Sequence, residues 1–114
     1  MSDDAHHAAF VPATGLLASL DLLQVSQSGP VLQVRLNRPT KRNAISDGLI
    51  AQLHTAFVNL PEGTRAVVVS GEGDHFCAGL DLSELVERDI HAAILHSRGW
   101  HACFDAVQYG KVPV

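Results

Sequence analysis

The sequence has little cysteine and no long apolar run, and each absence argues against a class of protein. Cys77 and Cys103 are the two cysteines in 114 residues, too few for a disulfide framework and without zinc-site spacing. We therefore expect free, buried or half-buried thiols in a reducing compartment. No apolar run approaches the length of about 20 residues that crosses a bilayer. The N-terminus lacks the basic region of a secretory signal, so a cytoplasmic location is expected.

Positive charge is also scarce. Eight Lys and Arg residues stand against twelve Asp and Glu residues, which gives a formal net charge of -4. Nucleic acids and anionic membranes usually bind a basic stripe, and the sequence has none, so neither partner is expected. The densest positive cluster is Arg35, Arg38, Lys41 and Arg42. This cluster suits a local phosphate site better than a long polyanion.

What remains is the balance of a soluble globular chain, with 46% hydrophobic and 18% charged residues. Residues 1–19 are Ala-rich and irregular, and we predict a flexible N-terminal extension there. The apolar segments 22–25 and 31–36 follow, and they flank a Ser-Gly-Pro break. The second segment alternates with period 2. This pattern predicts a β-hairpin.

A helix and a buried strand are expected next. Ser46 is a favoured N-cap and Asp47 places an acid in the first turn, so a helix should begin here and end near Pro61. Its apolar positions have helical spacing: Ile45, Leu49, Leu53, Ala56, Phe57 and Leu60. Residues 66–69 form a short apolar run rich in β-branched side chains. Such a run is typical of a strand in a parallel sheet whose two faces are both covered by helices.

The last third of the sequence predicts a loop and another helix. Residues 81–84 have the D-x-x-E form of a capping box, so a helix should start at Asp81. A further helix is expected from about Ile90 to Gln108. Its apolar face would comprise Ile90, Ala93, Ile94, Trp100, Cys103, Phe104 and Val107. Residues 111–114 are similar to the beginning of another strand. Strand, helix, strand, loop and helix is an α/β order.

The glycine-containing loop at residues 73–82 is the first candidate site. Small residues let a backbone approach a ligand closely, and Gly79 permits dihedral angles that other residues resist. The helix expected at Asp81 would add free N–H groups and a positive dipole end. A backbone N–H in such a place can stabilise a carbonyl oxygen as negative charge develops on it. An ordinary strand-loop-helix corner, where glycine only permits a turn, explains the same residues.

Two motifs stand on either side of the predicted central helix and strand. Residues 76–82, F-C-A-G-L-D-L, resemble the F-x-A-G-x-D loop of the enoyl-CoA hydratase/isomerase (crotonase) family. Residues 36–45, L-N-R-P-T-K-R-N-A-I, resemble its L-N-R-P-x-x-x-N-A-L segment. The order and separation are also similar, and the resemblance covers about residues 20–114. It implies an α/β fold: the N-terminal part of a crotonase-like domain (a ββα superhelix), with a hairpin, then β-α-β-loop-α units, and the C-terminal part absent.

The resemblance also implies roles for individual residues. In the family, the backbone N–H at the x of A-G-x-D is one of two oxyanion-hole donors, which implies this catalytic role for Leu80. The two motifs also contact CoA, and the implied substrate-binding positions are Lys41, Arg42, Ala44, Ala78, Asp81 and Leu82. Two solvated turn cations explain Lys41 and Arg42 equally well.

Other residues that could carry chemistry are interpreted structurally. We expect Asp81 to cap a helix and fix the loop rather than to act as a general acid or base, because Glu84 sits at the reciprocal position. His75 has no acidic or nucleophilic partner placed by the sequence. Trp100 and Phe104 have the spacing of core residues; proximity to an acyl pocket is the alternative.

The implied function is an acyl-CoA hydratase or isomerase of fatty acid metabolism that stabilises a thioester enolate, and enoyl-CoA hydratase is the favoured hypothesis. In the family the second oxyanion donor and the catalytic glutamates lie downstream, so this chain alone is expected to be inactive. No metal or redox cofactor is implied, since coenzyme A is part of the substrate. The implied partners are an acyl-CoA thioester, a complementing C-terminal segment and further copies in a trimer or hexamer. A non-catalytic CoA-binding or oligomerisation fragment is the alternative.

Overall fold

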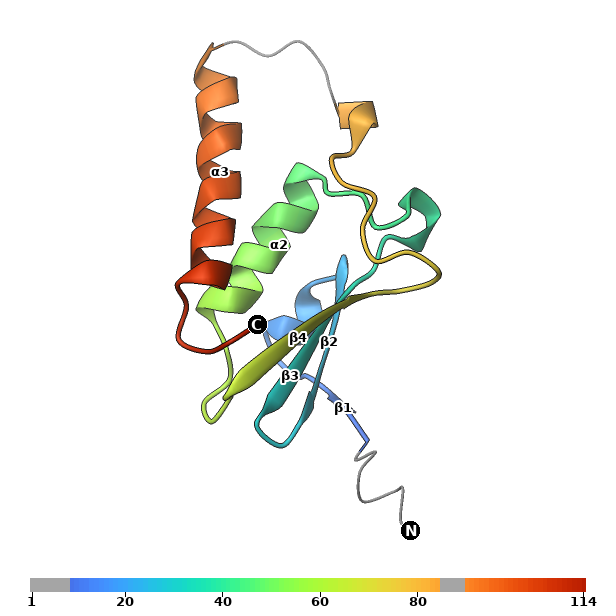
Figure 1. Cartoon of the computed structure of the whole chain (residues 1–114), viewed down its shortest axis with the longest axis vertical. Helices are drawn as coiled ribbons and strands as arrows, with labels where there is room; N and C mark the ends of the chain where they lie inside the picture. The colour runs from blue at the N-terminus through green and yellow to red at the C-terminus, as the bar shows by residue number, and fades with distance from the viewer. Residues whose placement is uncertain (1–8, 85–89) are drawn as a thin grey trace.

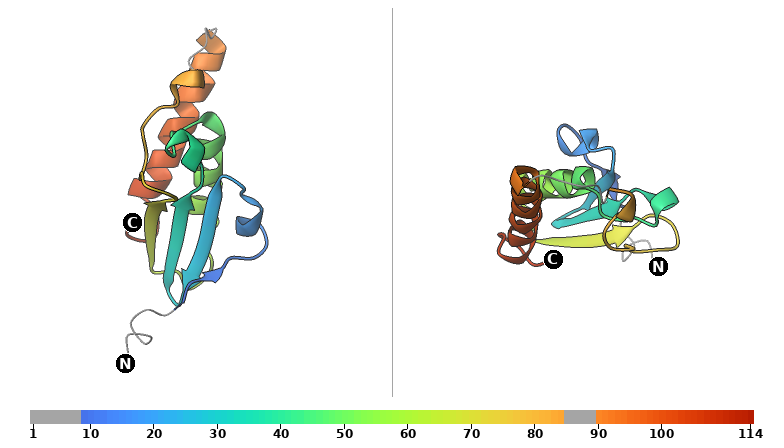
Figure 2. Two further views of the ribbon diagram at one scale, coloured as in Figure 1. Left: turned by 90° about the vertical axis from the view of Figure 1, so that its right-hand side faces the viewer. Right: turned by 90° about the horizontal axis from the view of Figure 1, so that it is seen from above.

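The computed structural model describes residues 9–84 and 90–114. Within them, four strands form one sheet in the order β1-β2-β3-β4. Helices α2 and α3 lie on one side of the sheet (Figures 1 and 2). The strands are β1 Val11–Pro12, β2 Leu23–Ser28, β3 Val31–Leu36 and β4 Ala66–Gly71. The helices are α2 Asp47–Val58 and α3 Ile90–Gln108, with 3₁₀ turns η1 Leu17–Ser19, η2 Pro39–Lys41 and η3 Leu82–Glu84.

The predicted hairpin is confirmed. β2 and β3 pair antiparallel from Leu23 opposite Leu36 to Ser28 opposite Val31. The turn consists of Gly29 and Pro30, and Gly29 has a φ of +57°, a conformation that glycine adopts without strain. Along β3 every second side chain, those of Leu32, Val34 and Leu36, is buried. Period 2 therefore directs one face of the hairpin into the core.

Helix α2 carries the chain from β3 to β4, which pair in parallel. It begins as predicted, because the Ser46 hydroxyl accepts a hydrogen bond from the Leu49 N–H at 3.1 Å. The helix ends at Val58, three residues before Pro61. Its buried side chains complete a core with the inner face of the sheet: Leu49, Ile50, Leu53, Ala56 and Phe57.

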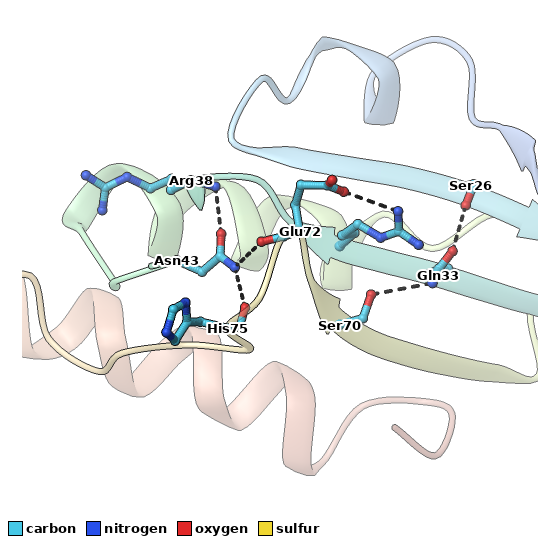
Figure 3. A network of polar contacts seen from close by, with 8 residues as sticks. Ser26, Gln33, Arg38, Asn43, Ser70, Glu72 and His75 are labelled. Atoms are coloured by element: carbon cyan, nitrogen blue, oxygen red, sulfur yellow. Dashed lines mark hydrogen bonds and ion pairs between the residues drawn. The ribbon is translucent and has the colours of Figure 1, made fainter. Parts of the chain in front are cut away.

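The prediction that residues 66–69 are buried on both faces is wrong. Val67 is buried on the helix-covered side of β4, whereas Val68 on the other side is 49% exposed. The uncovered face carries a polar ladder in which Gln33 links Ser26 and Ser70 at 3.3 and 3.4 Å (Figure 3). Strand β4 is thus half-buried, because the described residues place helices on one side of the sheet only.

Helix α3 has the predicted bounds, but its predicted apolar face is only partly buried. Cys103 is fully buried and Trp100 and Val107 pack against the core, whereas Ile94 and Phe104 are exposed. Ile90 is exposed as well. The reason is that α3 packs on α2 and leaves its far side open. No helix of the described residues has the length and apolar character that a membrane span requires.

Both ends of the described chain contact the sheet. Val11 and Pro12 pair with β2, and Leu17 is buried in the core. Parts of the second half of the expected flexible extension are therefore held by the sheet and the core, while a domain division after residue 19 stays a prediction and residues 1–8 lie outside the described part. At the other end, the Val67 N–H donates to the Pro113 carbonyl at 3.0 Å. Pro113 is thus held beside β4 by this bond.

Candidate functional site

The two sequence motifs lie side by side. The Ala78 N–H donates to the Arg42 carbonyl at 3.0 Å, and Ile45 is bonded to both Gly79 and Asp81 at 2.7 and 2.9 Å. Ile45 and Leu80 form the resulting parallel bridge. Backbone pairing of this kind gives the loop at residues 76–82 a defined path beside the end of the upstream turn. We call residues 38–45 and 71–82 the paired loops.

The N–H of Leu80 is left free by this pairing. In a parallel bridge Ile45 bonds to the residues before and after Leu80, so the polar groups of Leu80 point to the opposite side. Among the described residues no group accepts a hydrogen bond from the Leu80 N–H. Gly79, just before it, has a φ of +89°. Leu80 thus carries one of several loop N–H groups that have no acceptor among the described residues, and it lies between the two bonds that hold the loop to Ile45. The catalytic role of Leu80 itself stays a prediction.

Asp81 is buried and serves as an anchor of the loop. Its Oδ1 accepts hydrogen bonds from the Ser83 hydroxyl at 2.6 Å and the Ser83 N–H at 3.0 Å. Its Oδ2 pairs with Nη2 of Arg38 at 3.0 Å. Hydrogen bonds from Ser83 and then from Arg38 lower the pKa of Asp81 from 3.8 to about 2. The carboxyl group is therefore ionised at neutral pH and is unsuited to donating a proton.

The helix expected to start at Asp81 is, in the described residues, the single turn η3. Asp81 caps this turn through the Ser83 N–H, in agreement with its predicted structural role. The reciprocal contact expected from Glu84, and residues 85–89, lie outside the described part.

The predicted cluster of four cations needs correction. Arg35 pairs with Glu72 at 3.2 Å and Arg38 pairs with Asp81. Both acids come from the loop after β4, so their approach was not readable from the local sequence. Lys41 and Arg42 are exposed beside the paired loops. Within the cluster these two make no ion pair among the described residues, and their substrate-binding role stays a prediction.

Asn43 is the residue that the sequence interpretation missed. It is fully buried, and its Oδ1 accepts from the Arg38 N–H at 2.8 Å. Its Nδ2 donates to the carbonyls of Glu72 and His75 at 2.9 and 2.7 Å (Figure 3). A signal for it was present, because an Asn in a turn readily adopts positive φ, here +56°. Nothing local indicated which carbonyls it would bind.

The remaining candidates fall in two groups. Ala44 is buried, and its carbonyl accepts from the Arg38 guanidinium; Ala78 and Leu82 are exposed on the neighbouring loop. The six substrate-binding candidates therefore all lie on the paired loops, and their roles stay predictions.

Trp100 instead lines a groove between the two helices, together with Asp47, Ile50, His54, Leu95 and His96. In this groove Nδ1 of His96 lies 2.6 Å from Oδ1 of Asp47.

The two thiols differ in environment. Cys103 is buried, and desolvation raises its thiol pKa from 9.0 to about 11. Cys77 is half-buried, and its sulfur accepts from the Gly79 N–H at 3.4 Å. Both are free thiols, as predicted. The part of the chain that the structure describes brings no three His, Cys, Asp or Glu residues together as metal ligands.

A hairpin, a crossover helix to a parallel strand and a glycine loop held against the upstream turn define the N-terminal part of a crotonase-type fold. The family model for enoyl-CoA hydratase/isomerase matches residues 26–114, and the chain belongs to this family. A crystal structure from Rhodopseudomonas palustris CGA009, provisionally named an enoyl-CoA hydratase, superimposes with a TM-score of 0.78 and 50% identity. That match covers 94% of this chain and 39% of the other.

Curated relatives include hydratases and an isomerase. The chain is 40% identical over 63 residues to "Probable enoyl-CoA hydratase echA6" of Mycobacterium bovis, covering 54% of this chain and 26% of that protein. It is 44% identical over 57 residues to the mitochondrial Delta(3,5)-Delta(2,4)-dienoyl-CoA isomerase of Mus musculus, covering 48% and 17%. The chain therefore spans about a quarter or less of these relatives.

Proposed function

We propose that this chain forms the part of an acyl-CoA hydratase or isomerase that binds the thioester and supplies one donor of its oxyanion hole. The donor is the Leu80 N–H, and its availability is the single observation that carries the proposal. The pairing of Ile45 with Gly79 and Asp81 fixes the direction of this N–H without using it. A fixed donor costs no reorganisation when negative charge develops on a carbonyl oxygen.

Coenzyme A would be held along the paired loops. Exposed Lys41 and Arg42 offer positive charge for its phosphates, and the small Ala78 lets the backbone approach the pantetheine closely. Ala44, Asp81 and Leu82 complete this surface. Asp81 contributes through its backbone and by holding the loop, since its carboxylate is occupied by Arg38 and Ser83.

The chain alone is proposed to bind an acyl-CoA without turning it over. Loss of one oxyanion donor typically costs about 2.7–4 kcal/mol of transition-state stabilisation. In the described residues the paired loops present the Leu80 N–H, and the neighbouring carboxylate of Asp81 is occupied by Arg38 and Ser83. We propose that a complementing C-terminal segment supplies a second oxyanion donor and the carboxylate that moves the proton. This segment would dock beside β4, next to Pro113.

Enoyl-CoA hydration is the favoured reaction, because curated relatives from several bacteria are named hydratases. The thioester oxygen would be held in the same way in both reactions. Fatty acid metabolism and a cytoplasmic location stay predictions.

A non-catalytic binding or oligomerisation fragment is the second candidate, and one surface favours it. Ile90, Ile94 and Phe104 are exposed along the open side of α3. Exposed apolar side chains at helical spacing are suited to association with a further copy, as in a trimer or hexamer. Sedimentation of the chain distinguishes the cases, since a fragment built for oligomerisation sediments as a defined oligomer without ligand.

The proposal is tested by titrating the 114-residue chain with acetyl-CoA in a calorimeter and by assaying it with crotonyl-CoA. We expect saturable binding and no hydration. No heat at millimolar acetyl-CoA would remove the proposal of thioester binding. Measured hydration by the chain alone would contradict its proposed inactivity.

The role of the Leu80 N–H is tested by replacing Leu80 with its α-hydroxy acid, which exchanges the N–H for an ester oxygen and keeps the side chain. Acetyl-CoA should then bind about two- to tenfold more weakly, since one hydrogen bond contributes about 0.5–1.5 kcal/mol. The same exchange at the exposed Leu16, in the N-terminal segment, is the matched control and should leave binding unchanged. Equal acetyl-CoA affinities of the two ester-containing chains would contradict the proposed role of the Leu80 N–H.

A further inference from the structure

A single buried side chain closes the segment between β4 and residues 76–82 of the second motif. Strand β4 ends at Gly71, and the next carbonyl, that of Glu72, accepts from Nδ2 of Asn43. The His75 carbonyl, just before residues 76–82 of the second motif, accepts from the same nitrogen. One amide group thus holds both ends of residues 72–75 (Figure 3). Because the side chain is fully buried, water does not replace these hydrogen bonds.

The fold around this amide has no spare room. A Cβ atom at Gly71 would meet the carbonyl oxygens of His75 and Phe76, and it would lie 2.8 Å from Nδ2 of Asn43. The folded-back segment therefore packs directly onto the backbone of Gly71. Only a glycine at the end of β4 lets the Asn43 amide reach its two acceptors.

Asn43 is connected to the Leu80 N–H on both sides. Its side chain fixes the start of the loop at Glu72 and His75. Its near neighbours in the sequence, Arg42 and Ile45, make the backbone bonds that fix the loop on either side of Leu80. A displacement of Asn43 would therefore shift both attachments at once.

We infer that Asn43 is a positioning residue for the oxyanion donor: its amide group sets the path of residues 72–76 and, through it, the direction of the Leu80 N–H. This inference rests on the proposed function of Leu80. It assigns Asn43 no contact with substrate. The amide chemistry is required, because two carbonyls need two N–H donors and a carboxylate of the same shape has none.

Two substitutions separate the parts of this role. Asn43→Asp keeps the shape of the side chain and removes both donors. Asn43→Gly removes the side chain and keeps the positive φ of +56° accessible. The matched control is Asn59→Gly, at the exposed end of α2, where Nδ2 donates to the Thr55 carbonyl at 2.8 Å.

The experiment uses the ¹⁵N-labelled 114-residue chain and acetyl-CoA. Hydrogen exchange in the free chain reports on the Ala78 and Asp81 amides, which bond to the upstream turn. The Leu80 amide resonance reports on the thioester when acetyl-CoA is added. For both Asn43 variants we expect at least tenfold lower protection of these two amides and at least tenfold weaker binding. Protection of β3 should change less than twofold, and Asn59→Gly should behave as the unsubstituted chain.

Each outcome has one meaning. If Asn43→Gly binds acetyl-CoA with unchanged affinity and an unchanged Leu80 shift, the positioning role is overturned while the proposed function stands. If the unsubstituted chain gives no Leu80 shift at millimolar acetyl-CoA, the proposed function fails first and the positioning role with it. Should both variants unfold, hydrogen exchange of the side-chain amide protons of Asn43 in the unsubstituted chain tests the positioning role. Exchange much slower than that of the Asn59 side-chain amide supports this role, and equal exchange overturns it.

Discussion

The sheet with α2 and the paired loops are held together by different forces. In the first region, Leu32, Val34 and Leu49 are fully buried and apolar. In the second, the buried groups are polar: Asn43 binds two carbonyls and Asp81 pairs with Arg38. Apolar burial is non-directional and stabilises the whole domain, whereas a buried hydrogen bond specifies one local geometry. A rigid scaffold thus carries a loop whose shape depends on a few polar groups.

The largest effect is expected from a cavity in the apolar region. Leu32→Ala should lower the free energy of unfolding by about 2–5 kcal/mol, because the side chain is fully buried. Val68→Ala on the uncovered face of β4 is the control, with an expected loss of about 1 kcal/mol or less. Urea unfolding measures both. Equal losses would mean that the uncovered face is buried in solution.

Two glycine substitutions should have opposite signs. Gly71→Ala should destabilise the chain by about 1–3 kcal/mol, since its Cβ would collide with the paired loops. Gly99→Ala in α3 meets open space and should stabilise the chain by about 0.5–1 kcal/mol, because alanine favours a helix. Thermal unfolding of the two variants checks the signs. A stabilising Gly71→Ala would show that the paired loops do not pack as described.

A substitution at the start of α2, where the two regions meet, should have a smaller effect on the free energy of unfolding. Ser46→Ala removes the acceptor of the Leu49 N–H and should cost about 1 kcal/mol. Ser97→Ala, at an exposed position inside α3, should change stability by about 0.5 kcal/mol or less. Denaturant titration distinguishes these values. Similar effects of the two substitutions would argue against the cap.

Acid should weaken the polar region first. The pKa of Asp81 is about 2 in the folded chain and near its ordinary value of about 3.9 in the unfolded chain, so the ionised group favours folding. This contribution is present above about pH 4 and is lost as the pH falls toward 2. Melting temperatures of the unsubstituted chain and Asp81→Asn should therefore converge between pH 4 and pH 2. The exposed Asp74→Asn exchange controls for the change in net charge.

The same comparison explains what could be predicted from the sequence. The hairpin and the bounds of α3 follow from local periodicity, and the start of α2 follows from its cap. Burial of the second face of β4 and of the outer side of α3 was predicted wrongly, because periodicity shows which residues could be covered and not what covers them. Arg38, paired with an acid 43 residues later, illustrates the limit for the paired loops. Their position was indicated by motif resemblance, and their polar contacts required the tertiary structure.

The most direct test of the account is a crystal structure of the chain with acetyl-CoA bound. We predict that the thioester oxygen lies about 2.7–3.1 Å from the Leu80 nitrogen, with the coenzyme along the paired loops. A thioester bound in the groove between α2 and α3, with the Leu80 N–H turned away from it, would contradict the account.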